Sequence, residues 1–428
     1  MNLTVYGLWH LGCVTAACCA GGGHRVVGLD LDEKVVADLT NGKAPLHEPG
    51  LDDLIAKSLS GKNLSFTTDP AVALRDADVL WVAFDTPVND RDEADVAFVR
   101  QRLEAIAPHL RPGTLVLISS QVPVGFTGDL ERDWANKQLH YAVSPENLRL
   151  GKAIDVFTKP DRVILGVRDE SDKPRLAELL APFTSDLVWM SVESAEMTKH
   201  ALNAFLATSV TFINEVARVC EAVGADAKEV ERGLKTEARI GPKAYLGPGA
   251  AFAGGTLARD LRFLQDLGSR QKVETPLVSG VLASNETHKA WLRRTVDRML
   301  SSAPAGAPVA VLGLTYKPGT STLRRSSAVE LCQWLKSRGA TPRAHDPAVN
   351  ALPPELKGVI ELCPTPREAL RGAELAVLAT EWPDYRSLGA EDFVSTMRRP
   401  RVIDQTWFLA GQLAGDPRIV YVATGRRA

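Results

Sequence analysis

Residues 3–12 are Leu3-Thr4-Val5-Tyr6-Gly7-Leu8-Trp9-His10-Leu11-Gly12. The apolar run up to Tyr6 predicts a short buried strand that enters a glycine turn. A helix is predicted over Val14 to Ala20, ended by the three glycines that follow it, and a second strand over His24 to Asp30. This order of strand, glycine turn, helix and strand closed by an acid is typical of a dinucleotide-binding domain.

The glycine turn (Gly7–Gly12) keeps two of the three glycines of a dinucleotide fingerprint. Gly7 and Gly12 are in place, but the middle position, where a diphosphate approaches the backbone, is Trp9. We expect this side chain to crowd the diphosphate or to make the loop swing aside. Asp30 stands where a carboxylate binds a ribose hydroxyl and repels a 2′-phosphate, so the expected cofactor is NAD rather than NADP. A Rossmann-like domain that has lost tight cofactor binding stays as the alternative.

Further apolar segments extend this pattern to a doubly wound sheet. Strands are predicted over Val79–Phe84 and Thr114–Ser119, with helical segments between them. A second pattern of the same kind begins near Pro308. Its predicted elements are a strand over 309–314, a helix over 327–338, a strand that ends in Asp346-Pro347, and strands over 375–379 and 401–404.

The middle of the chain gives a different signal. From Glu193 to Val223 apolar residues recur at helical spacing, with no proline or glycine. Such a helix is longer than one small α/β domain needs, so we expect it to join two domains and to pack against a partner. We therefore predict the α/β class, with two Rossmann-like doubly wound domains joined by a long central helix. The predicted domains cover 1–190, 191–300 and 301–428.

Composition and charge limit the kinds of ligand and partner that the chain is expected to bind. The 428 residues are 45% hydrophobic and 24% charged with a net charge of -2, so the chain lacks the basic excess used to bind nucleic acid. Six cysteines stand without metal-ligand spacing, so we expect them to be reduced and expect no metal site. The apolar N-terminus lacks the basic start of a signal peptide, and no segment approaches the ~20 apolar residues of a membrane span. We expect a cytoplasmic protein with no membrane partner.

Four loops and one helix carry a family resemblance through their order and spacing. The loops are Gly42-Lys43-Ala44-Pro45-Leu46-His47-Glu48-Pro49-Gly50-Leu51, Asp85-Thr86-Pro87, Ser120-Gln121-Val122-Pro123-Val124-Gly125 and Ser144-Pro145-Glu146-Asn147-Leu148-Arg149-Leu150-Gly151. The helix is Ala195-Glu196-Met197-Thr198-Lys199-His200-Ala201-Leu202-Asn203-Ala204-Phe205. Together they resemble the UDP-glucose/GDP-mannose dehydrogenase family nearly from end to end. Asp85 stands at a family glycine and Gln121 at a family threonine.

The most informative departure lies in the segment that resembles the family's active-site loop. This segment contains Tyr245-Leu246-Gly247-Pro248-Gly249 and Gly254-Gly255-Thr256-Leu257-Ala258-Arg259-Asp260. At the position of Thr256 the family has a cysteine, which forms a thiohemiacetal and then a thioester. A hydroxyl ionises far less readily than a thiol, so Thr256 does not readily replace that nucleophile.

The resemblance also implies roles for individual residues. Lys199 and Asn203, four apart on one helix face, hold the reacting oxygen and a water. Asp260 assists proton transfer through that water, and Glu146 lies near the thioester and its hydrolysis. Implied cofactor contacts are Gly7, Trp9, His10, Leu11, Gly12, Asp30, Thr86, Pro87, Gln121 and Arg324. Implied substrate contacts are Leu148, Arg149, Arg239, Tyr245, Gly249 and Lys317, of which Arg239 reaches the sugar site of a neighbouring subunit.

Three functions stay open. The first is an NAD-dependent nucleotide-sugar dehydrogenase with altered chemistry, which removes one hydride to give an aldehyde or ketone, or reaches the acid through an aldehyde hydrate. The second is the standard two-step oxidation of a UDP-hexose by a base-activated Thr256. The third is a non-redox nucleotide-sugar-binding protein, favoured by the departures at Trp9, Gln121, Thr256 and Thr406 and opposed by the intact catalytic helix. The resemblance and the long helix imply a homodimer.

Overall fold

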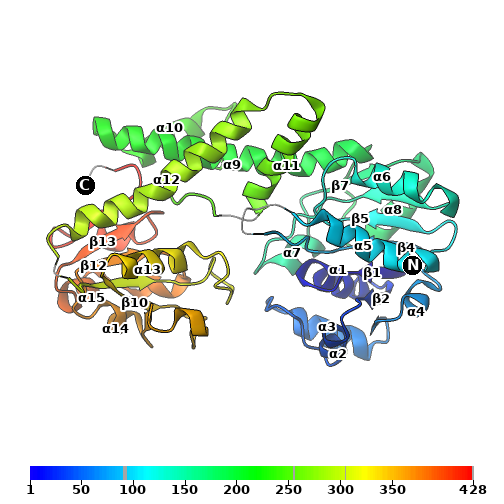
Figure 1. Ribbon diagram of the computed structural model, residues 1–428, viewed down its shortest axis with the longest axis horizontal. Helices are drawn as coiled ribbons and strands as arrows, with labels where there is room; N and C mark the ends of the chain where they lie inside the picture. The colour runs from blue at the N-terminus through cyan, green and yellow to red at the C-terminus, as the bar shows by residue number, and fades with distance from the viewer. Residues whose placement is uncertain (90–93, 254–255, 304, 427–428) are drawn as a thin grey trace. The chain divides into compact units, whose positions relative to one another are not determined.

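The computed structural model describes residues 1–89, 94–253, 256–303 and 305–426, which form two compact units. The first unit comprises Met1–Leu202 and Arg262–Lys272, and the second comprises Asn203–Leu261 and Val273–Ala428. Each unit is built on one sheet with helices packed against it (Figure 1). The predicted α/β class is confirmed.

The first sheet has the strand order β3-β2-β1-β4-β5-β6-β7-β8. Its strands are β1 (Asn2–Tyr6), β2 (Arg25–Leu29), β3 (Leu64–Thr67), β4 (Val79–Val82), β5 (Leu115–Ile118), β6 (His140–Val143), β7 (Val163–Val167) and β8 (Leu187–Ser191). Neighbours pair in parallel, apart from the antiparallel pair β6 and β7. The order 3-2-1-4-5-6 is that of the dinucleotide-binding fold, and ligands bind where it reverses, between β1 and β4.

Helices cover both faces of this sheet. They are α1 (His10–Gly21), α2 (Glu33–Thr40), α3 (Leu51–Ser60), α4 (Pro70–Leu74), α5 (Val96–Ile106), α6 (Phe126–Asp133), α7 (Ala153–Thr158) and α8 (Lys173–Leu180). In β5, Leu115 and Leu117 face the core that contains α1, whereas Val116 and Ile118 face the core that contains α5. Alternate residues of a strand point to opposite faces, so a strand covered on both faces is apolar throughout.

The second unit repeats this plan with the strand order β11-β10-β9-β12-β13-β14. Its strands are β9 (Pro308–Leu312), β10 (Thr341–His345), β11 (Glu361–Leu362), β12 (Leu375–Leu378), β13 (Arg401–Asp404) and β14 (Val420–Val422), all paired in parallel. Its helices include α10 (Ala227–Thr236), α12 (Pro276–Leu300), α13 (Ser327–Ser337), α14 (Pro366–Leu370), α15 (Ala390–Thr396) and α16 (Ala410–Leu413). Helices α12 and α13 share one core with the sheet, and α14 and α15 share the other.

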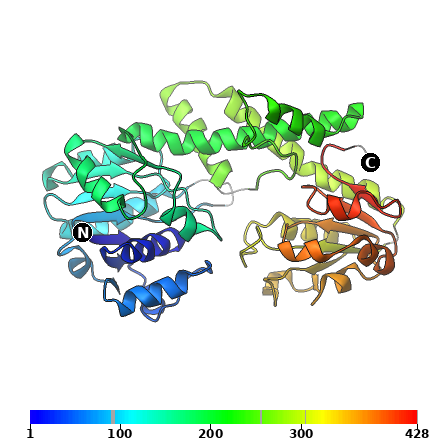
Figure 2. The same ribbon diagram turned by 180° about the vertical axis from the view of Figure 1, so that it is seen from behind.

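Two helices contribute residues to both units. The predicted long helix is confirmed as α9 (Val192–Val223), which Figure 2 shows as a continuous green ribbon. The other is α11 (Thr256–Gln271). The first helix, α1, begins at His10 rather than at the predicted Val14, because Gly12 and His10 hide its first turn from an apolar pattern. Within the described part of the chain, no helix has the length and apolarity to span a membrane.

Candidate functional site

The glycine turn lies at the carboxyl end of β1, where the strand order reverses. Gly7 has φ +93°, and a Cβ on it would lie 2.5 Å from Phe84 Cδ1. A Cβ on Gly12 would lie 1.7 Å from the Gly7 carbonyl oxygen. Both positions therefore require glycine. Trp9 precedes the first turn of α1 and is 50% exposed, so the turn closes without a glycine in the middle.

Asp30 fixes the other side of this turn. Its Oδ2 accepts a hydrogen bond from Leu8 N at 2.8 Å, and its Oδ1 accepts one from Asp32 N at 3.1 Å. The carboxylate thus stands directly after β2, beside the glycine turn, where an adenosine ribose is bound in this fold. The turn and Asp30 together fit NAD.

A second loop, residues 85–87, follows β4 on the far side of the reversal point. Asp85 Oδ2 accepts a hydrogen bond from Leu11 N, in the first turn of α1, at 3.0 Å. Thr86 is buried, and its Oγ1 donates to the Gln121 carbonyl oxygen at 2.7 Å. The Pro87 carbonyl accepts from Asp95 N at 2.8 Å. Loops that are far apart in the sequence therefore meet at one edge of the sheet.

Glu48, for which no role is predicted from the sequence, links its own loop to the start of α7 and to the start of α1. Its buried carboxylate accepts from Gly151 N at 2.8 Å and from Ala153 N at 2.9 Å. The ring nitrogen Nε2 of His10 lies 2.9 Å from Glu48 Oε2. His10 is thus held by a carboxylate that also fixes the start of α7.

Lys199 and Glu146 form a close pair in the first unit. Lys199 Nζ donates to the Glu146 carbonyl oxygen at 2.6 Å and lies 3.3 Å from Glu146 Oε1. Gln121 Nε2 donates to the same Oε1 at 2.6 Å, and Leu148 N donates to Oε2 at 3.0 Å. Three donors therefore surround this carboxylate. Among the described residues no donor reaches the buried Gln121 Oε1.

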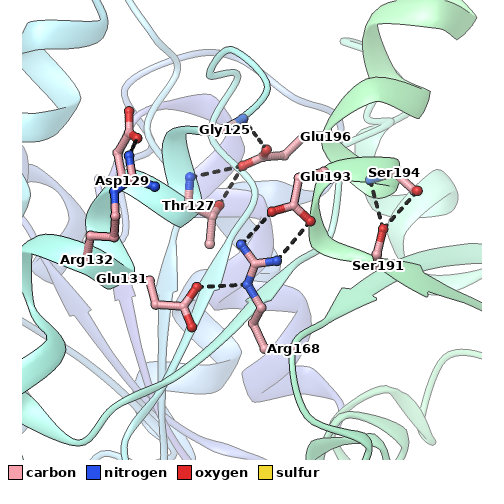
Figure 3. Close-up of polar contacts among 10 residues, drawn as sticks. All are labelled: Gly125, Thr127, Asp129, Glu131, Arg132, Arg168, Ser191, Glu193, Ser194 and Glu196. Carbon is pink, nitrogen blue, oxygen red and sulfur yellow. Dashed lines mark hydrogen bonds and ion pairs between the residues drawn. The ribbon is translucent and has the colours of Figure 1, made fainter.

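Glu196, one turn before Lys199, fixes the start of α9 (Figure 3). Its buried carboxylate accepts from Gly125 N at 2.7 Å, Thr127 N at 3.1 Å and Thr127 Oγ1 at 2.6 Å. These donors begin α6, whose preceding residue, Gly125, offers no side-chain cap. An acid at a helix N-terminus satisfies free N–H groups and the helix dipole. Glu196 therefore sets the position of the helix that presents Lys199.

The second unit brings two other predicted catalytic residues together. Asn203 Nδ2, on α9, donates to Asp260 Oδ2, on α11, and both residues are buried. Thr256 is the first residue of α11 and is exposed, one helical turn before Asp260. Gly254 and Gly255, which precede it, lie outside the described residues. Lys199 and Asn203 are four apart along α9, so they leave it on one face.

Three buried polar side chains hold the loop that leads to Thr256. Asn214 Oδ1 accepts from Gly249 N at 2.9 Å, and His288 Nε2 donates to the Gly249 carbonyl at 2.8 Å. Asn285 makes both hydrogen bonds that Phe252 offers, at 3.0 and 2.9 Å. The sequence interpretation missed all three. Each is a polar residue on an apolar helix face, a weak signal when its partner lies more than 30 residues away.

The predicted substrate contacts are spread over both units. Leu148 and Arg149 follow β6 in the first unit. In the second unit, a Cβ on Gly249 would lie 3.3 Å from Thr406 Cγ2, so Gly249 packs against Thr406, one of the departures from the family pattern. The remaining ones lie in loops of the second unit, and these are Arg239, Tyr245 and Lys317. Arg324, predicted as a cofactor contact, lies in the loop between β9 and α13 of the second unit.

No thiol replaces the missing cysteine. All six cysteines are buried and free of disulfides. Burial raises the pKa of the Cys18 and Cys332 thiols to about 12 and that of the other four as well. Thiolates are the nucleophilic form, so these side chains are unreactive at neutral pH.

Known proteins with the same domains identify the family. Residues 1–184, 193–287 and 310–410 match the NAD binding, central and UDP binding domains of the UDP-glucose/GDP-mannose dehydrogenase family. The chain is 35% identical to a UDP-glucose 6-dehydrogenase of Rhizobium meliloti, over 94% of each chain. It is 33% identical to that of Pseudomonas aeruginosa, over 100% of this chain and 98% of that one.

A solved structure agrees with these relatives. The UDP-glucose dehydrogenase of Pyrobaculum islandicum superposes with a TM-score of 0.87 at 30% identity, covering 100% of this chain and 98% of that one. These matches confirm the predictions of an NAD-dependent oxidoreductase and of a nucleotide-sugar ligand at the level of the family. The chain therefore belongs to the UDP-glucose/GDP-mannose dehydrogenase family.

Proposed function

We propose that this chain oxidises one CH–OH group of a UDP-sugar-like nucleotide sugar by a single hydride transfer to NAD. The observation that carries the proposal is Thr256, which starts α11 where the family has its thioester-forming cysteine. Bound NAD supplies the hydride acceptor. The product is an aldehyde, or a ketone if a ring carbon faces the nicotinamide.

The residues around the reacting alcohol then have the following roles. Lys199 and Asn203 donate hydrogen bonds to the oxygen, which gains negative charge as the hydride leaves. Asp260 takes the hydroxyl proton, directly or through a water. The carbon loses a hydride, the oxygen loses a proton, and a C=O bond forms, so one oxidation balances without a covalent enzyme intermediate. The buried Asn203–Asp260 hydrogen bond supports this assignment.

Two features of the first unit support an arrest after this step. In the family, Glu146 lies beside the thioester and its hydrolysis, but here three donors surround its carboxylate, one of them Gln121 at a family threonine. A carboxylate held in this way positions its neighbours rather than activating a water. Gln121 Oε1 is left to accept from the cofactor or substrate. The alternative to this arrest is that water hydrates the aldehyde and the hydrate transfers a second hydride to NAD, which gives the acid without a thioester.

We further propose a homodimer in the cytoplasm, with regions 1–190, 191–300 and 301–428 serving NAD binding, dimerisation with the catalytic loop, and nucleotide-sugar binding. The large side chains Phe205, Phe212 and Val219 support the dimer, because they are 71%, 49% and 57% exposed and recur every seven residues along α9. Such a spacing places them on one helix face, where a second copy would cover them. Arg239 would then reach the partner's sugar site.

The product tests the proposal. The purified chain is incubated with NAD and UDP-, GDP-, CDP- and dTDP-sugars, and products are weighed by mass spectrometry. We expect a product lighter than its substrate by two hydrogens. A product that has lost two hydrogens and gained one oxygen would show full oxidation and overturn the arrest. Absence of product with every sugar, despite NAD binding, would favour a nucleotide-sugar-binding protein.

The single substitution Thr256→Cys tests whether the hydroxyl alone explains the arrest. We expect this variant not to become an efficient uronate-forming enzyme, because Gln121 still holds Glu146 and the departure at Thr406, beside Gly249, remains. The double variant T256C/Q121T should form more acid than either single variant. Efficient acid formation by T256C alone would contradict a role for Gln121.

A further inference from the structure

Asp85 places a carboxylate on the part of the chain that must receive the cofactor's diphosphate. In the dinucleotide-binding fold, the diphosphate lies against the N-terminus of the helix after the first strand, where backbone N–H groups point outward. In this chain that helix is α1, and its Leu11 N–H already donates to Asp85 Oδ2 at 3.0 Å. Asp85 stands at a family glycine.

The backbone does not explain this carboxylate. Asp85 is absent from the residues with positive φ, so neither aspartate nor glycine is demanded there by a left-handed conformation. It lies in the loop after β4, which ends at Val82, directly across the strand-order reversal from the glycine turn. Its side chain therefore comes to α1 from the strand that flanks the ligand crevice.

Two acids flank the short glycine turn. Asp30 holds Leu8 N at one end and Asp85 holds Leu11 N at the other. Burial raises the pKa of the neighbouring Cys13 thiol, and the charges of Asp85 and Asp30 raise it further. Both carboxylates thus act electrostatically on the first turn of α1. Asp30 meets a neutral ribose, whereas Asp85 would meet a doubly negative diphosphate.

We propose that Asp85 determines the affinity for NAD: its carboxylate occupies the Leu11 N–H group that the diphosphate requires, and the diphosphate binds only as this carboxylate moves away. Asp85 then competes with the diphosphate of the ligand for the Leu11 N–H group. It weakens ligands that carry a diphosphate and leaves adenosine unaffected. Because Asp85 is exposed, dissolved salt screens its charge and reduces the difference.

Calorimetric titration of the full chain tests this without any sugar substrate, so its failure is distinct from failure of the proposed oxidation. The ligands are NAD, ADP and adenosine, and the variants are Asp85→Ala and Asp85→Asn. The matched control is Asp69→Ala, since Asp69 is also exposed and accepts from the first N–H groups of a helix, α4, in the same unit. Circular dichroism confirms that each variant folds.

We expect D85A to bind NAD and ADP about fivefold to tenfold more tightly, the size of a helix-terminus charge effect. D85N should show a smaller gain, because its amide oxygen still accepts from Leu11 N without a charge. Adenosine affinity should not change, and about 1 M salt should reduce the gain. Unchanged or weaker NAD binding in both variants would overturn the proposal. An equal gain for adenosine, or an equal gain in D69A, would also overturn it.

Discussion

Lys199 and Glu146 form a pair whose two members cannot be changed independently. Their side chains are only 11% and 15% exposed, and the ammonium contacts both the carbonyl and the carboxylate of Glu146. Removing one charge of a buried pair leaves the other desolvated and costs about 3–5 kcal/mol. A loss of activity in a single variant therefore has to be separated from a loss of folding.

Lys199→Ala is expected to abolish NADH production, because the oxygen that becomes an alkoxide loses its cationic donor; a decrease of at least ~10² in kcat is typical of such a loss. Absorbance of NADH measures it. The variant K199A/E146Q removes both charges, should keep the fold and should stay inactive. Lys235→Ala serves as control, since Lys235 pairs with Glu231 on α10 and should leave turnover intact. Normal turnover in K199A would exclude Lys199 from the site.

At the level of elements, Glu196 and Glu193 are a matched pair on one helix. Glu196 is buried and accepts three hydrogen bonds at the start of α6, whereas Glu193 is half exposed and pairs with Arg168 (Figure 3). We expect Glu196→Ala to lower the free energy of unfolding by about 2–3 kcal/mol. Glu193→Ala should lower it by less than about 1 kcal/mol. Urea unfolding measures both, and equal losses would contradict the capping role.

The elements that the sequence predicted share one property. β1, β4, β5, β9 and α9 are marked by local apolar patterns, which is why their positions could be predicted. The antiparallel direction of the β6–β7 pair could not be predicted in this way, because an apolar pattern marks a strand but does not show in which direction it pairs. The three side chains that hold the loop before Thr256 could not be predicted for a similar reason: Asn214, Asn285 and His288 find their partners only in the folded chain.

His288 gives that loop a dependence on pH. Its pKa is lowered from 6.5 to about 4, chiefly by burial and in part by the nearby Arg218, while the bond to the Gly249 carbonyl opposes this. Below about pH 6.5 the His288 side chain binds a proton in the unfolded chain, whereas in the folded chain it stays neutral down to about pH 4. The free energy of unfolding should therefore decrease as the pH is lowered through this window, by up to about 3 kcal/mol in total.

His288→Gln should flatten this dependence, because glutamine keeps an N–H for the Gly249 carbonyl but does not titrate. Urea unfolding at several pH values between 4 and 7.5 measures the slope. The pKa values of His24 and His345 are also lowered by burial, so the slope should decrease without vanishing. An unchanged slope would mean that His288 is not protonated on unfolding in this range.

At the scale of the whole molecule, the exposed apolar stripe of Phe205, Phe212 and Val219 on α9 is the surface through which we expect two copies of the chain to pair. Phe212→Asp places a charge in its middle and should convert the dimer to a monomer in light scattering coupled to size exclusion. Val72→Asp is the matched control, because Val72 is similarly exposed but lies on α4, away from the stripe. A wild-type monomer at micromolar concentration, or dissociation of V72D as well, would contradict a dimer through α9.

Arg239 makes the dimer necessary for activity if it serves the partner's site. It lies after α10 on the same unit as Asn203 and is well exposed, held by Glu237 at 2.9 Å. K199A and R239A should each be inactive alone. In a mixed dimer, however, the R239A subunit keeps its Lys199 and receives Arg239 from the K199A subunit, which restores one site. Co-expression should therefore recover about a quarter of wild-type activity, since half of randomly paired dimers are mixed and each has one complete site. No recovery in dimers shown to be mixed would place Arg239 in the site of its own subunit.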